Sequence, residues 1–118
     1  MNPERHWARI TSADNIPLHE GRSVTIAGKE LAIFNLGDRF ATIDNQCPHQ
    51  GGPLCDGIVS GAVVVCPLHG WRFDLNTGLA VRSSLPGCVT TYPTRVEDGI
   101  VLVDVGHGRR IEPEEAVA

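Results

Sequence analysis

Residues 47–54 read CPHQGGPL and residues 66–74 read CPLHGWRFD, and these two stretches carry most of the information in the chain. Each supplies one cysteine and one histidine, so the candidate metal ligands are Cys47, His49, Cys66 and His69. Structural zinc sites usually pair like ligands across two to four residues, and a single intervening residue is awkward for a shared ion. Two thiolates and two imidazoles instead suit a two-iron cluster, with the cysteines on one iron and the histidines on the other.

The same residues resemble the Rieske protein family, in particular its small soluble ferredoxins. The resemblance runs through both stretches to Gly78 and continues over Tyr92-Pro93 and Glu97–Gly99. It implies one Rieske [2Fe–2S] cluster, bound by the four ligands named above. It also implies an antiparallel β-sandwich or barrel with a small inserted cluster-binding subdomain.

Short runs rich in β-branched residues, separated by turn residues, independently predict an all-β sandwich or small barrel. The runs are Ser23–Ala27, Glu30–Leu36, Arg39–Asp44, Ala62–Val65, Trp71–Asp74, Thr90–Val96 and Ile100–Val105. Asp98-Gly99 is the strongest hairpin signal, because such a pair readily adopts the positive φ angles of a type I′ turn. No long helix is indicated, and Ser12 or Asp14 is expected to cap a single turn that Pro17 stops.

A chain of 118 residues is expected to form a single domain around one core. We expect a base from about residues 3–44 and 89–106, into which a cluster-binding unit of about 45–88 is inserted. The segment 107–118 lacks apolar periodicity and is expected to be loose. No second catalytic domain fits, so we expect an electron-transfer protein, a component of an oxidoreductase system, rather than an enzyme on its own.

The charge pattern and the remaining cysteines bear on partners and location. A formal net charge of −4 offers no broad basic face for nucleic acid or anionic lipid. No apolar run approaches the length of a membrane span and no signal peptide is recognised, so a cytoplasmic protein with no membrane or nucleic-acid partner is expected. Cys55 and Cys88 are expected to remain thiols and to pack as small apolar side chains.

The residues after the second histidine bear on the reduction potential. High-potential Rieske proteins resemble this chain up to His69-Gly70 but then carry hydroxyl side chains, where this chain has Trp71 and Phe73. We therefore expect a potential near the low end of the Rieske range, at about −150 mV. The resemblance further implies a cover formed by Ser84–Gly87 and a small docking patch for redox partners. The patch would comprise Gln50, Leu68, Trp71, Leu85 and Pro86.

Three functions are consistent with these observations. Two are electron carriers with different electron acceptors, and the third is a zinc-binding domain. The leading one is a carrier that takes one electron from a flavin-containing reductase and delivers it to a terminal oxygenase, as a dioxygenase component. The alternative is the small subunit of an assimilatory NAD(P)H nitrite reductase, which resembles the chain around residues 92–99. A non-redox domain that binds zinc at the same four residues is a remote alternative.

Overall fold

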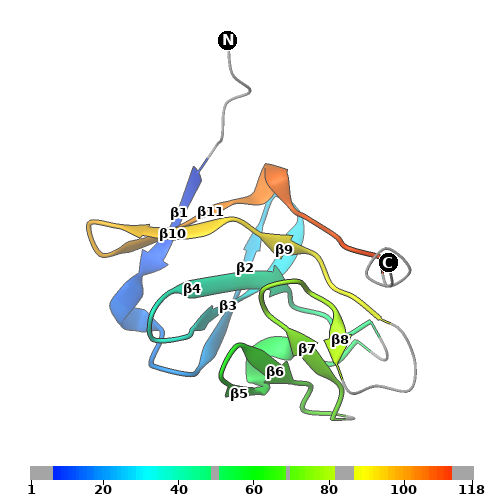
Figure 1. The fold of residues 1–118 in the computed structure, drawn as a ribbon. Helices are drawn as coiled ribbons and strands as arrows, with labels where there is room; N and C mark the ends of the chain where they lie inside the picture. Colours follow the sequence, from blue (N-terminus) through cyan, green and yellow to red (C-terminus); the bar gives the residue numbers. More distant parts are fainter. Residues whose placement is uncertain (1–6, 49–50, 69, 82–86, 113–118) are drawn as a thin grey trace.

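Three antiparallel sheets make up the fold (Figure 1). The structure is a computed structural model, and it describes residues 7–48, 51–68, 70–81 and 87–112. The strand orders are β1-β11-β10, β2-β3-β4-β9 and β5-β6-β7-β8. Helical structure in the described residues is limited to single 3-10 turns, so the all-β prediction is confirmed.

The strands are β1 (Trp7–Ser12), β2 (Gly21–Ile26), β3 (Lys29–Asn35), β4 (Phe40–Asp44), β5 (Ile58–Ser60), β6 (Val63–Val65), β7 (Arg72–Asp74), β8 (Ala80–Val81), β9 (Thr91–Tyr92), β10 (Thr94–Glu97) and β11 (Ile100–Asp104). The 3-10 turns are η1 (Ala13–Asn15), η2 (Leu54–Asp56) and η3 (Val105–His107). The cap expected before the first turn is present, since the Ser12 hydroxyl accepts a hydrogen bond from the Asp14 amide at 3.3 Å. Among the described residues no helix is long and apolar enough to cross a membrane.

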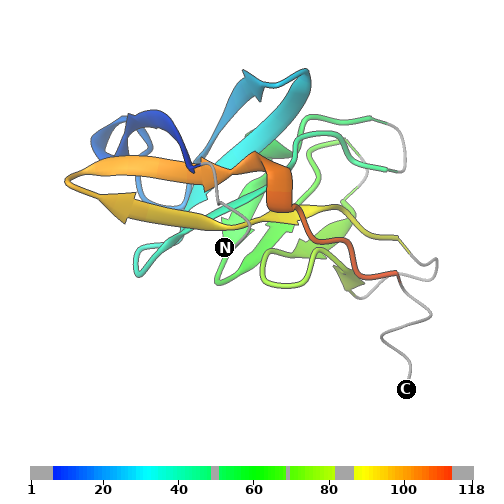
Figure 2. The same ribbon diagram turned by 90° about the horizontal axis from the view of Figure 1, so that it is seen from above.

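Two tight hairpins fix the register of the base sheets. Asp98 and Gly99 connect β10 to β11 with φ angles of 53° and 77°, so the type I′ turn expected at this pair is confirmed. Ala27 and Gly28 connect β2 to β3 with nearly the same angles, 53° and 77°. The β10–β11 hairpin extends beyond the rest of the molecule in Figure 2, and β1 pairs with its β11 side.

The run expected over Thr90–Val96 is two strands in two different sheets. β9 pairs with β4, whereas β10 pairs with β11. Pro93 lies between them, and a proline has no N–H to continue a ladder. The chain therefore changes sheets at Pro93. Strands β1, β5 and β8 were not predicted.

Strand β3 separates two hydrophobic cores because its alternate side chains point to opposite faces. Leu31 and Ile33 belong to the core that includes Val101 and Val103 of β11. Ala32 and Phe34 belong to the second core, which contains the side chains of the cluster loops and the small sheet: Ala41, Ile43, Cys47, Leu54, Val59, Val64, Cys66, Phe73, Leu75 and Val89. The small sheet β5–β8 is thus packed directly on the base through β3.

The start of the C-terminal segment is tied to the fold. The Thr91 amide donates to the Arg109 carbonyl at 2.9 Å, and the Arg109 amide donates back to the Thr91 carbonyl at 2.7 Å. Arg109 therefore extends the sheet beyond β9, in contrast to the loose segment expected from residue 107 onward. Apolar periodicity missed this contact because it is made by backbone groups. Residues 113–118 lie outside the described residues.

Candidate metal centre

The first candidate ligand, Cys47, opens a tight loop that returns on itself. Its amide donates a hydrogen bond to the carbonyl of Gly52 at 2.8 Å, and its carbonyl accepts one from the Gly51 amide at 2.7 Å. Gly51 has a φ of +73°, a backbone conformation that residues other than glycine rarely adopt. The loop therefore needs a glycine four positions after the cysteine.

The loop that begins at Cys66 has the same arrangement. The Cys66 amide donates to the carbonyl of Trp71 at 2.6 Å, and its carbonyl accepts from the Gly70 amide at 3.1 Å. Gly70 also has a φ of +73°. The repeated sequence pattern is thus a repeated backbone structure, and each copy presents one cysteine at the same place in its turn.

The two loops lie against each other with their cysteines inside. A Cβ atom placed on Gly52 of the first loop would lie 3.0 Å from the Cys66 sulfur and 3.1 Å from the Leu68 side chain. Cys47 and Cys66 are each only 2% exposed. The sulfur atoms therefore occupy a protected position between facing loops, and Gly52 is required for the close approach.

The two buried thiols fit the cysteine end of a Rieske cluster. Such a cluster takes two cysteines on one iron, and the facing loops bring Cys47 and Cys66 to one protected place. His49 and His69 lie outside the described residues, so their role as the nitrogen ligands stays a prediction. Of the predicted docking patch, Gln50, Leu85 and Pro86 lie outside them as well, together with Ser84 of the predicted cover.

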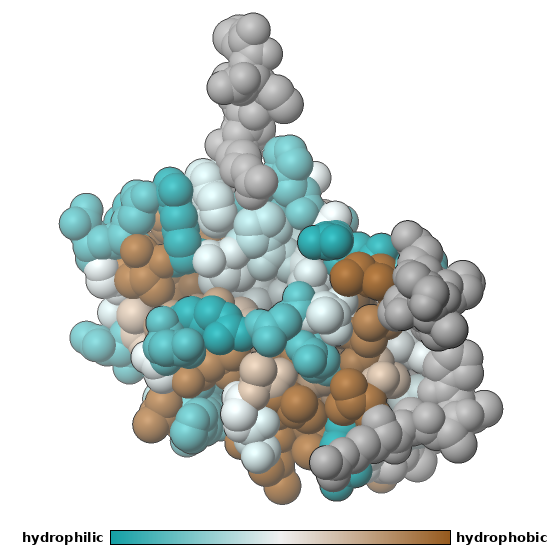
Figure 3. Space-filling model, viewed as in Figure 1, coloured by the Kyte–Doolittle hydropathy of each residue, from teal (hydrophilic) through white to brown (hydrophobic). Residues whose placement is uncertain are grey.

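Aromatic and apolar side chains surround the second loop. Phe73 is fully buried, and its ring centroid lies 6.3 Å from that of the half-buried Trp71. Leu68, in the loop itself, is 57% exposed. Figure 3 shows apolar surface gathered in the lower half of the molecule, over the small sheet. Neither aromatic side chain carries a hydroxyl group, which is the feature behind the expected low potential.

A polar network is centred on Asp44, three residues before Cys47, and no motif spacing in the sequence predicted it. Asp44, the last residue of β4, accepts hydrogen bonds from the Tyr92 hydroxyl at 2.9 Å and from the Thr90 amide at 3.1 Å. Burial, with the Asp44 carboxylate as the second cause, raises the pKa of Tyr92 well above its ordinary value. This network joins the end of β4 to β9.

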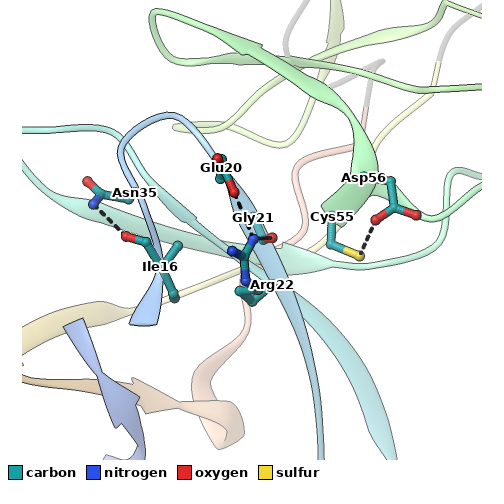
Figure 4. A network of polar contacts seen from close by, with 7 residues as sticks. All are labelled: Ile16, Glu20, Gly21, Arg22, Asn35, Cys55 and Asp56. Carbon is teal, nitrogen blue, oxygen red and sulfur yellow. Dashed lines mark hydrogen bonds and ion pairs between the residues drawn. The ribbon is translucent and has the colours of Figure 1, made fainter. Parts of the chain in front are cut away.

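The two further cysteines, Cys55 and Cys88, lie in different surroundings. Cys88 is 3% exposed, so the expectation of a small buried side chain is confirmed for it. Cys55 is half-buried, and its thiol donates to a carboxylate oxygen of the neighbouring Asp56 at 3.7 Å (Figure 4). Burial, and next to it the Asp56 charge, raises the pKa of Cys55, which keeps this thiol protonated.

Comparison with known proteins assigns the fold and these loops to one family. Residues 6–93 match the Rieske [2Fe-2S] domain, and the chain belongs to the Rieske family, whose cofactor is a Rieske [2Fe–2S] cluster. The ferredoxin component of the naphthalene 1,2-dioxygenase system from Pseudomonas aeruginosa is 33% identical over 99 residues, which are 84% of this chain and 95% of that protein.

Two solved structures extend the comparison. A chain in the complex of reduced oxygenase and oxidized ferredoxin of carbazole 1,9a-dioxygenase superposes with a TM-score of 0.80 at 27% identity, covering 92% of this chain and 100% of that one. A putative NADH-dependent nitrite reductase small subunit from Mycobacterium tuberculosis superposes with a TM-score of 0.78 at 25% identity, covering 92% and 99%. The chain is therefore similar to both classes that the sequence suggested.

Proposed function

We propose that this protein is a one-electron carrier whose Rieske cluster is bound by Cys47, His49, Cys66 and His69. The observation that supports it most is the pair of buried cysteines on two facing loops that share one pattern of backbone hydrogen bonds. A bound Rieske cluster accepts and releases single electrons at a potential above that of four-cysteine ferredoxins. The protein is a component of an oxidoreductase system and turns over no substrate on its own.

The residues of this chain contribute rigidity and exclusion of water. The paired turns hold each cysteine by hydrogen bonds on both sides, so the thiolates need not move when charge changes. The core that contains Cys47 and Cys66 is continuous with the base sheet, which leaves little freedom for rearrangement. A ligand shell that stays in place on reduction lowers the reorganisation cost of electron transfer. The same packing excludes water from the two cysteines, and the apolar side chains around them influence the reduction potential.

The electron donor in this proposal is a flavin-containing reductase and the acceptor is a terminal oxygenase. The similarity to a ferredoxin component of a dioxygenase system, at 33% identity, and to a ferredoxin-sized chain in an oxygenase complex supports this choice. The structural similarity to a nitrite reductase small subunit favours the alternative acceptor. A cytoplasmic location and the division into a base and an inserted unit of residues 45–88 belong to the same proposal.

A transfer assay tests the choice of acceptor. The protein is reduced under anaerobic conditions and mixed in a stopped-flow instrument with either the oxygenase of a naphthalene dioxygenase system or a sirohaem nitrite reductase. We expect the oxygenase to reoxidise the carrier at least about tenfold faster than the nitrite reductase does, since complementary docking surfaces accelerate encounter. Faster reoxidation by the nitrite reductase would replace the oxygenase proposal with the alternative.

A further inference from the structure

Asn45 is a buried polar residue at the junction between strand β4 and the first cluster loop. It directly follows Asp44, the last residue of β4, and precedes Cys47 by two positions. It is only 1% exposed, although amide side chains are mostly found at the surface. A buried amide is tolerated when its donors and acceptors are paired.

Four hydrogen bonds connect Asn45 to residues on either side of the loop. On the side of the base sheet, its backbone amide donates to the Glu30 carbonyl at 3.0 Å, and its side-chain Nδ2 donates to Glu30 Oε2 at 2.6 Å. On the side where the loop ends, its carbonyl accepts from the Leu54 amide at 2.7 Å and its Oδ1 accepts from the Cys55 amide at 2.8 Å. Asn45, at the start of the loop, thus joins the beginning of β3 to the residues where the loop ends.

The two cluster loops are closed at their bases in different ways. The second loop is closed by a regular ladder between β6 and β7, in which Val65 pairs with Arg72 and Val64 with Phe73. At the base of the first loop the described residues form only an isolated bridge, between Gln46 and Pro53. That bridge consists of two backbone bonds, from the Leu54 amide to the Asn45 carbonyl at 2.7 Å and from the Cys47 amide to the Gly52 carbonyl at 2.8 Å. The side-chain bonds of Asn45, to Glu30 and to the Cys55 amide, therefore support the base of the first loop where the second loop has a regular ladder.

We infer that Asn45, with Glu30 as its partner, is a positioning residue that fixes the first ligand loop on the base sheet and thereby controls how firmly the cluster is held. This inference rests on the proposed function, because it assumes a cluster bound at Cys47. Asn45 touches neither iron nor sulfide in this account. It acts through the backbone of the loop whose first ligand is Cys47.

The chemistry of the contact requires an amide in one orientation. Asn45 offers a donor to Glu30 and an acceptor to the Cys55 amide. In the Asn45→Asp variant the acceptor is kept, but a carboxylate oxygen would face the Glu30 carboxylate. Adding Glu30→Gln restores a donor at that contact, with the direction of the bond reversed. Glu30→Gln alone leaves an acceptor for Asn45, since a glutamine amide has both groups.

Asn35, at the other end of β3, is a matched control. Its Nδ2 donates to the Ile16 carbonyl at 2.8 Å, as Figure 4 shows, and its Oδ1 accepts from the Gly37 amide at 2.9 Å. It has the same donor and acceptor arrangement as Asn45 but no contact with the first loop. Asn35→Asp therefore makes the same chemical change at a site away from the first loop. A general loss of stability would accelerate cluster loss in both variants, whereas a positioning role would show only in Asn45→Asp.

The experiment compares full-length holoprotein of the wild type, the three single variants and the Glu30→Gln/Asn45→Asp double variant. Cluster loss to a chelator is followed by the visible absorbance, and hydrogen exchange is measured at the Leu54 and Cys55 amides. For Asn45→Asp we expect cluster loss and exchange at these amides to accelerate by about tenfold or more, as for a broken buried hydrogen bond. In the double variant both rates should return to within about threefold of the wild type. Glu30→Gln should accelerate cluster loss less than Asn45→Asp does, because it keeps an acceptor for Asn45, and Asn35→Asp should leave cluster loss unchanged.

Three results would overturn the inference. They are an unchanged rate of cluster loss in Asn45→Asp, an equal acceleration in Asn35→Asp, and a double variant no better than Asn45→Asp. The last comparison stays informative even if the Asn45→Asp variant does not fold. A wild-type protein without the spectrum of a [2Fe–2S] cluster would instead contradict the proposed function, so the two failures are distinguishable.

Discussion

Cys47 and Cys66 show how single residues acquire a chemical role from their surroundings. A cysteine thiol with 2% exposure is ordinarily a small apolar core side chain. Here both thiols lie at equivalent positions of two equivalent turns. The Cys66 sulfur of the second loop also packs closely against Gly52 of the first loop. The sequence spacing predicted the pair, and the structure adds the contact between the loops.

Replacing His69 by cysteine tests the electrostatic argument about the imidazoles. A thiolate in place of a neutral imidazole adds negative charge to the cluster, so the reduction potential should fall, by on the order of 100 mV. Spectroelectrochemical titration of the purified variant measures this directly. An unchanged potential in a folded variant that retains its cluster would show that imidazole neutrality does not set the potential.

Tyr92 supplies a prediction about pH and stability. Its hydroxyl donates to the Asp44 carboxylate from a buried position, so Tyr92→Phe should lower the free energy of unfolding by about 1–2 kcal/mol at neutral pH. Because burial and Asp44 raise the pKa of Tyr92 in the folded protein, the unfolded chain ionises first. The contribution of Tyr92 is therefore complete below about pH 10 and is lost as the pH rises from there.

Urea unfolding at several pH values, for the wild type and Tyr92→Phe, measures this difference. The two proteins should converge above about pH 10. A difference that stays constant, or that grows with pH, would contradict the assignment of the hydrogen bond to the neutral phenol.

At the scale of elements, the turns were the most predictable part of the chain. The Asp98-Gly99 hairpin follows from a local conformational preference, and Pro93 explains the division of one expected strand into two. β1 was missed because its side chains, from Trp7 to Ser12, are half-buried or exposed with no regular alternation. The pairing of Asn45 with Glu30 could not be predicted, since it depends on the register between residues fifteen positions apart.

Gly78 offers a test of the turn that connects β7 to β8 in the small sheet. It has a φ of +80°, and a Cβ there would collide with the Val89 carbonyl oxygen. Gly61 has a comparable φ of +59° but open space around it, so it is the matched control. Gly61→Ala should cost about 1 kcal/mol from backbone strain, and Gly78→Ala at least about 2 kcal/mol more. Thermal unfolding measures both, and equal losses would contradict the close packing of Val89 on this turn.

At the scale of the whole molecule, β3 makes the base and the small sheet one packed body. Phe34 is fully buried in the core that also contains Cys47 and Cys66. The sequence predicted an inserted cluster-binding unit, but it could not show that both faces of β3 are used, because a run such as Leu31–Phe34 is apolar throughout and has no alternation to read.

Phe34→Ala should therefore weaken the base and the cluster site together. The lost burial costs about 3–5 kcal/mol, and the visible absorbance of the cluster should disappear in the same thermal transition as the far-ultraviolet circular dichroism signal. The two signals are recorded on one sample of the wild type and of the variant. Loss of the cluster in a separate, earlier transition, with the β signal retained, would mean that the two parts are energetically independent.

The reduced-state electron paramagnetic resonance spectrum, recorded with iron and acid-labile sulfide analysis of the same sample, tests the central claim most directly. A red-brown protein with two irons and two sulfides per chain, and a signal whose average g lies below the free-electron value, is the predicted result for ligation by two cysteines and two histidines. A colourless protein that contains one zinc ion per chain and gives no such signal would contradict the account.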